Sequence, residues 1–184
     1  LTKNDEGEII SSSLGLRDEN QQKDFFKKFL TDKNINSNFF KEFVGLKNTD
    51  YFIEKFDAHY GRPIHNSLYE IKQMGLKQVF SYILSLVRFH FDLIDKKLNN
   101  PSTEDVKKVR KITLKVIKHI EVFSFKFHKI FNGQANLVER DVYHHYALMF
   151  HLSGLLEPAN NNNEKIAIYR SLTRELMNKL DQIL

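Results

Sequence analysis

Apolar residues recur every three or four positions along most of this chain, which is the spacing of one face of an α-helix. The longest such pattern covers about residues 66–98, and the turn Asn99-Asn100-Pro101 separates it from a second pattern over about 102–131. Two long helices joined by so short a connection favour antiparallel packing. We therefore predict an all-α, multi-helix bundle built on this long hairpin.

Shorter helices are predicted before the hairpin. We expect one from near Asp18, one over 38–44 and one over 50–60, the last closed by Gly61 as a left-handed cap. The turn Gly61-Arg62-Pro63 should then lead into the long helix. Residues 1–16 are polar, so we expect an N-terminal tail there and a single helical domain over 17–184.

Two C-terminal helices are predicted after the hairpin. One should cover about 136–156, and the other carries an apolar seam from Ile166 to Ile183. The asparagine run 160–163 between them is too short to be more than a solvated connection.

Composition narrows the chemistry that such a bundle can perform. The 184 residues are 41% hydrophobic and 28% charged, which suits one globular domain. The absence of Cys excludes disulfides and thiolate chemistry and suits a reducing compartment, so we expect an intracellular, cytoplasmic protein. No apolar run approaches the roughly 18 residues of a transmembrane helix. Because the chain starts at Leu1 without Met or a signal-peptide pattern, we expect a domain excised from a larger protein.

The second long helix carries the entire net charge of the chain. Eight basic and three acidic residues lie in 102–131, so this segment has the same net charge of +5 as the whole sequence. Seven of the eight are lysines beside or opposite the apolar seam: Lys107, Lys108, Lys111, Lys115, Lys118, Lys126 and Lys129. Like charges four apart destabilise an isolated helix by about 0.2–0.5 kcal/mol a pair. Acids of neighbouring helices, such as Glu139 or Glu175, could neutralise this face.

The alternative to neutralisation is a binding surface. A free lysine face would attract an acidic macromolecule, either protein or RNA, or another phosphate-bearing surface. Phe123 and Phe127 should point into the seam, so we expect few apolar side chains to be exposed beside the lysines. A helix that lies on a membrane surface would need such exposed apolar side chains. Our leading hypothesis is therefore a helical macromolecule-binding module.

A different hypothesis rests on the pattern Arg140-Asp141-x-x-x-His145 in the predicted helix 136–156. It resembles the Arg–polar–x3–His motif of HEPN domains, small α-helical bundles many of which are metal-independent ribonucleases. The resemblance implies that Arg140 holds the scissile phosphate, His145 transfers a proton and Asp141 orients the site, across the interface of a homodimer. The basic helix would then guide the RNA. Whether the chain is an enzyme stays open at this point.

A structural role is the alternative for His145. On an ideal helix His145 shares a stripe with Val138, Val142 and Met149, and Arg140 lies about 140° away around the axis. His145 could thus be a core histidine held by Asp141 or by a backbone carbonyl.

A metal site is a third interpretation of the same helix. Asp141, His144 and His151 could supply ligands, but zinc or iron would need another from His90, His119 or His128. The pattern of di-iron bundles, paired Glu with Glu-x-x-His, is absent. We therefore expect neither a metal nor a cofactor.

Overall fold

The computed structural model describes residues 45, 46, 48–130, 138, 142–151, 156 and 159–184. This part of the chain contains six α-helices and no strand, which confirms the predicted all-α, multi-helix bundle. Leu46–Leu184 form one compact unit. The predicted tail 1–16 and the helices from Asp18 and over 38–44 lie outside the described residues and stay predictions.

The helix predicted over 50–60 is replaced by two helices. α4 (Thr49–Phe56) begins after Asn48, whose side chain accepts a hydrogen bond from the backbone N–H of Asp50 at 2.9 Å. α5 (Ala58–Gln73) begins after Asp57, which has a positive φ of 62° and caps the new helix with its carboxylate. A non-glycine residue in this conformation breaks the helical path, so α4 ends at Phe56, about four residues earlier than expected.

Gly61 does not act as a left-handed cap. It lies inside α5, where a Cβ would come within 2.6 Å of the carbonyl carbon of Phe52 and 2.8 Å of the nitrogen of Ile53. Glycine is needed here because the backbones of α4 and α5 approach closely and leave no room for a side chain. A cap would instead have required glycine for its ability to adopt a positive φ. The predicted turn over 61–63 was therefore wrong, and α5 also accommodates Pro63.

The first arm of the predicted hairpin, about 66–98, consists of two helices and a π-helical turn. α5 ends at Gln73, and Gly75 follows with a φ of 79°, so the chain turns there. α6 (Lys77–Asp92) continues into η1 (Leu93–Lys97), where Leu98 donates from its backbone N–H to Leu93 at 2.9 Å. The apolar spacing runs across the turn because both helices bury their apolar side chains in the same core.

The second arm corresponds closely to the predicted range 102–131. α7 (Thr103–Ser124) is the longest helix of the described chain, and the π-helical segment η2 (Phe125–Ile130) extends it. No helix among the described residues has the length and apolar content that spanning a bilayer requires.

Two further helices follow η2. α9 (His144–His151) covers part of the predicted range 136–156, and α10 (Asn162–Asp181) matches the predicted last helix. The asparagine run has structural roles: Asn161 caps α10, and the Asn162 side chain bonds both the N–H and the C=O of Asn99 at 2.8 and 2.9 Å. These bonds fix the start of α10 beside the start of α7.

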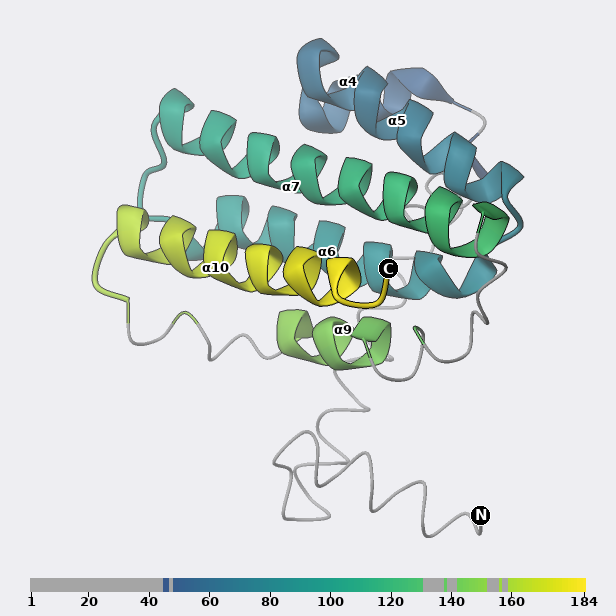
Figure 1. Ribbon diagram of the computed structural model, residues 1–184. Helices are drawn as coiled ribbons and strands as arrows, with labels where there is room; N and C mark the ends of the chain where they lie inside the picture. The colour runs from purple at the N-terminus through teal and green to yellow at the C-terminus, as the bar shows by residue number, and fades with distance from the viewer. Residues whose placement is uncertain (1–44, 47, 131–137, 139–141, 152–155, 157–158) are drawn as a thin grey trace, which may run out of the picture. The chain divides into compact units, whose positions relative to one another are not determined.

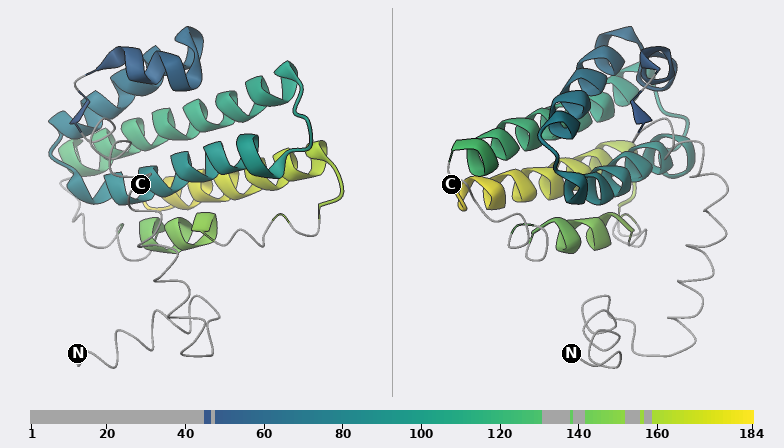
Figure 2. Two further views of the ribbon diagram at one scale, coloured as in Figure 1. Left: turned by 180° about the vertical axis from the view of Figure 1, so that it is seen from behind. Right: turned by 90° about the vertical axis from the view of Figure 1, so that its right-hand side faces the viewer.

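Helix α7 lies at the centre of this unit. It contacts α5, α6 and α10, and α9 packs against α6. Figure 1 shows α7 and α10 running in the same direction with α6 behind them, and Figure 2 shows the same layers from two other sides. Aromatic rings fill the space between α6, α9 and α10, with Phe89 in contact with both Phe150 and Tyr169. One face of α7 is thereby buried and the opposite face is left outside.

Candidate binding surface on helix α7

A capping box fixes the start of α7. The Ser102 hydroxyl accepts from the backbone N–H of Asp105, and the Asp105 carboxylate accepts from the backbone N–H of Ser102, both at 3.1 Å. The bonds from Ser102 hold the pKa of the Asp105 carboxyl below its usual value. The lysines that follow thus lie on a regular helix of 22 residues with a defined origin.

Buried hydrogen bonds fix the rotation of α7 about its axis. Thr113 Oγ1 lies 2.7 Å from His90 Nδ1 of α6 and 2.8 Å from the Tyr169 hydroxyl of α10, and it donates to the Val109 carbonyl at 3.1 Å. A hydroxyl has one hydrogen, so His90 Nδ1–H and the Tyr169 O–H must both donate to Thr113. His90, Thr113 and Tyr169 are fully buried. Only one rotation of α7 satisfies these bonds, and it directs the lysine side outward.

His90 is a neutral core histidine. Burial, with a smaller contribution from Arg110, lowers the pKa of His90 from 6.5 to about 3. Its Nε2 has no hydrogen-bond partner among the described residues. Within the same part of the chain, no three His, Asp or Glu side chains are grouped so that they could hold a metal ion. Asp141 and the side chains of His144 and His151 lie outside the described part.

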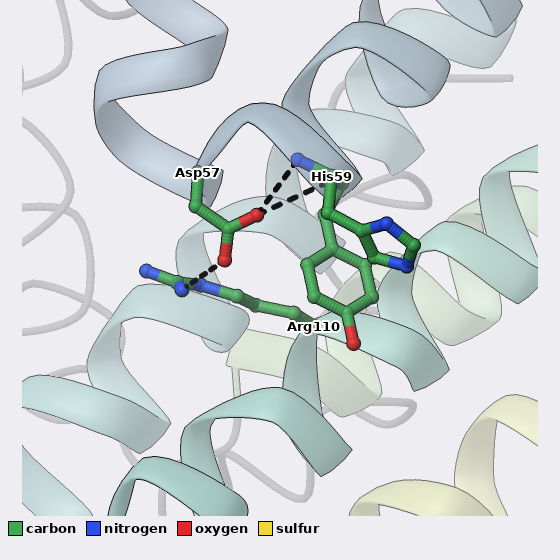
Figure 3. Close-up of polar contacts among 4 residues, drawn as sticks. Asp57, His59 and Arg110 are labelled. Carbon is green, nitrogen blue, oxygen red and sulfur yellow. Dashed lines mark hydrogen bonds and ion pairs between the residues drawn. The ribbon is translucent and has the colours of Figure 1, made fainter.

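Arg110 belongs to the basic helix but not to its exposed face. Its guanidinium donates to Asp57 Oδ2 at 2.6 Å, while Asp57 Oδ1 accepts from the backbone N–H groups of His59 and Tyr60 at 2.9 and 3.3 Å. Figure 3 shows the Asp57 carboxylate between the start of α5 and the Arg110 side chain. One carboxylate therefore caps α5 and neutralises the only arginine of the helix.

Four lysines of α7 form an exposed row. Lys107, Lys111, Lys115 and Lys118 are all exposed, and at helical spacing the other three lie within about 40° of the Lys111 direction. The ion pairs among the described residues include none of these four. These four lysine side chains therefore have no ion-pair partner within the described part of the chain.

The other predicted binding lysines differ in their surroundings. Lys108 is half-buried and close enough to Asp105 to help lower the pKa of that carboxyl. Lys126 is exposed in η2, and the Lys129 side chain is outside the described part. Of the acids expected to neutralise the face, Glu175 accepts from the Tyr146 hydroxyl at 3.0 Å, and Glu139 is not among the described residues.

Two exposed apolar side chains beside the lysines were missed by the sequence reasoning. Val122 is 53% exposed and Phe125 54% exposed, whereas Phe123 is buried as predicted. The spacing Lys118, Val122, Phe125 continues the lysine row at intervals of four and three, which is the signal that identifies them. The expectation that the lysines lack apolar neighbours was wrong for this end of the helix.

His145 is exposed, so its interpretation as a core histidine was wrong. Val142 and Tyr143 form a π-helical start to α9, and Tyr143, Tyr146 and Phe150 occupy the core. The irregular start rotates the buried side of the helix away from the stripe that an ideal helix predicts. Arg140 and Asp141 lie outside the described residues, so their catalytic roles stay a prediction.

Comparisons of the chain with protein-family models, with curated proteins and with solved structures found no match.

Proposed function

We propose that this chain is a helical macromolecule-binding module whose exposed α7 lysines engage an acidic partner. The observation that supports this is the row Lys107, Lys111, Lys115 and Lys118, exposed and without an ion pair among the described side chains. Four like charges in a row repel one another, and a polyanion relieves that repulsion and releases its own counterions. The buried bonds of Thr113 hold the row in place before a partner arrives, which lowers the entropic cost of binding.

Immobilised heparin, a uniform polyanion, provides the test. The triple substitution Lys111→Glu, Lys115→Glu and Lys118→Glu should abolish retention near physiological salt while far-UV circular dichroism stays unchanged. Retention of the wild type should fall steeply as salt rises, because the contact is electrostatic.

A scattered triple reversal is the matched control. Arg62→Glu, Lys96→Glu and Lys179→Glu change exposed residues on α5, η1 and α10, and either triple variant lowers the net charge from +5 to −1. If the row binds the polyanion, the control should keep most of the retention. If the two variants lose retention on heparin equally, the net charge alone determines retention, and the proposal would be wrong.

The second candidate function is a HEPN-like, metal-independent ribonuclease that uses Arg140 and His145. The exposure of His145 favours it, because a proton-transfer group must reach its substrate. The α7 lysines would then hold the RNA backbone, and the resemblance adds a homodimer with the site at its interface.

RNA cleavage separates this enzyme from a binding module. Cleavage should persist in EDTA and disappear in His145→Ala with the fold intact. Lys111→Glu should weaken RNA binding without changing the cleavage rate at saturating RNA. Absence of cleavage at concentrations where RNA is bound would exclude the ribonuclease.

A further inference from the structure

One line along α7 combines basic and apolar side chains. We define the α7 stripe as Lys107, Lys111, Lys115, Lys118, Val122 and Phe125, all of them exposed. Their spacing of three and four residues keeps them within about 40° of the Lys111 direction, over about 27 Å of helix. Ile130, at the end of η2, is 60% exposed. The stripe is thus basic over its first two thirds and apolar at its end.

The cations of the α7 stripe are all lysines. Arg110, the one arginine of the helix, is occupied by Asp57 at 2.6 Å. Lysine is a flexible point charge, whereas arginine provides bidentate geometry for a defined carboxylate or phosphate. A lysine-only stripe therefore suits a surface of diffuse negative charge better than a single shaped anion.

The apolar side chains at the end of the α7 stripe indicate which class of acidic partner the stripe fits. Single-stranded nucleic acid stacks its bases on aromatic rings, of which the α7 stripe has one, Phe125, and the aliphatic side chains Val122 and Ile130 offer nothing to bases or phosphates. Protein interfaces are depleted in lysine and enriched in arginine, tyrosine and tryptophan at their centres. An anionic bilayer can bind both the basic and the apolar part of the α7 stripe, since its headgroups attract lysines and its interface takes up apolar side chains.

We propose that the α7 stripe binds the surface of an anionic lipid bilayer. The four lysines contact the headgroups, and Val122, Phe125 and Ile130 enter the boundary between headgroups and acyl chains. This inference rests on the proposed function and specifies its partner. It also explains why Val122 and Phe125 stay more than half exposed, whereas Val116 and Ile120 of the same helix are completely buried.

Vesicle co-sedimentation of the full chain provides the first test. The wild type should bind phosphatidylcholine vesicles that contain 30% phosphatidylserine and leave pure phosphatidylcholine vesicles unbound. One lysine at such a surface contributes about a fivefold change in partitioning, so Lys111→Glu, Lys115→Glu and Lys118→Glu together should reduce binding by about a hundredfold or more. The scattered charge control should reduce it far less.

The apolar contribution is measured with a variant of unchanged charge. Val122→Ser with Phe125→Ser should lower partitioning into the anionic vesicles by roughly tenfold, because the lost contacts are hydrophobic. Retention on heparin should stay the same, since every lysine is kept. Both positions are more than half exposed, so the thermal transition should not move.

A fluorescent reporter tests insertion directly. The chain has no Trp, so Phe125→Trp introduces a single tryptophan. Its emission should shift to the blue on anionic vesicles, and lipids brominated near the headgroup should quench it. Tyr69→Trp is the control, because Tyr69 is 46% exposed on α5 and is not a member of the α7 stripe, so it should show neither effect.

The outcomes distinguish the lipid proposal from the function on which it rests. Heparin retention that needs the lysines, with no binding to anionic vesicles, overturns the lipid partner and leaves the polyanion-binding function standing. Quenching of the Phe125→Trp variant by a uridine oligonucleotide but not by vesicles overturns it in favour of RNA. Vesicle binding that survives Val122→Ser with Phe125→Ser undiminished overturns the insertion. Heparin retention unaffected by the lysine reversals refutes the underlying function.

Discussion

Thr113 offers the sharpest test of how the bundle holds α7 in its orientation. Thr113→Val keeps the shape of the side chain and removes the hydroxyl that joins α6, α7 and α10. His90 Nδ1–H and the Tyr169 O–H then lose their acceptor in a site where both residues are fully buried. Each orphaned buried donor costs about 1–3 kcal/mol, so the substitution should lower the free energy of unfolding by about 2–5 kcal/mol.

Thr173→Val is the matched control. Thr173 is also buried in a helix, but its hydroxyl donates only to the carbonyls of Tyr169 and Arg170 in its own helix, both at 3.0 Å. Those carbonyls keep their helical partners when the hydroxyl is removed, so the loss should stay below about 1 kcal/mol. Urea unfolding followed by circular dichroism at 222 nm measures both variants.

A double-mutant cycle identifies the bond itself. Tyr169→Phe removes one of the two orphaned donors, so adding it to Thr113→Val should cost less than the two single substitutions together. A coupling of about 1 kcal/mol is expected for a direct hydrogen bond. Equal losses for Thr113→Val and Thr173→Val, with no coupling to Tyr169, would refute the reasoning that this network fixes the helix.

Three further predictions address other contacts of the fold. Gly61→Ala forces a Cβ to within 2.6 Å of the Phe52 carbonyl carbon, so it should destabilise the protein by about 1–3 kcal/mol in urea, and no loss would contradict the close crossing of α4 and α5. The pKa of His90 is lowered from 6.5 to about 3, so between these values the unfolded chain binds a proton that the folded chain does not. Stability should therefore fall as the pH drops below 6.5, by up to about 1.4 kcal/mol per unit, and His90→Phe should flatten this dependence of the urea midpoint. Arg110→Ala should lower the free energy of unfolding by about 1 kcal/mol, and by less at high salt. It should leave heparin retention unchanged, because the partner of Arg110 is Asp57 rather than a ligand.

The features of the fold that depend only on nearby residues could be predicted from the sequence. Ser102 and Asp105 sit at the spacing of a capping box, and the seam of α7 repeats every three or four residues, so the start and face of that helix follow from the sequence alone. Lys107, Lys111, Lys115 and Lys118 were likewise placed correctly outside, because the opposite side of the helix is largely apolar.

Features that depend on a distant neighbour were not predictable. Gly61 could serve a positive φ or a close approach, and only the backbone of Phe52 decides between them. Phe125 is a different case, because its spacing from Lys118 and Val122 already indicates the exposed side of the helix. His145 was misplaced because the π-helical start at residues 142–143 changes the phase of α9. The miss at Gly61 thus follows from long-range geometry, and the miss at His145 follows from a local irregularity of the helix.

The pairing of α7 with α10 also constrains the order in which the protein can fold. Thr113 and Tyr169 are 56 residues apart, and Lys165 Nζ bonds the carbonyl of Lys97 across 68 residues. During synthesis, the α10 side of α7 has no covering until the last 20-residue helix leaves the ribosome. A nascent chain that stops short of Asn162 therefore exposes the apolar seam of α7 next to its lysines. Such a chain is a natural substrate for a chaperone until α10 has been made and covers the seam.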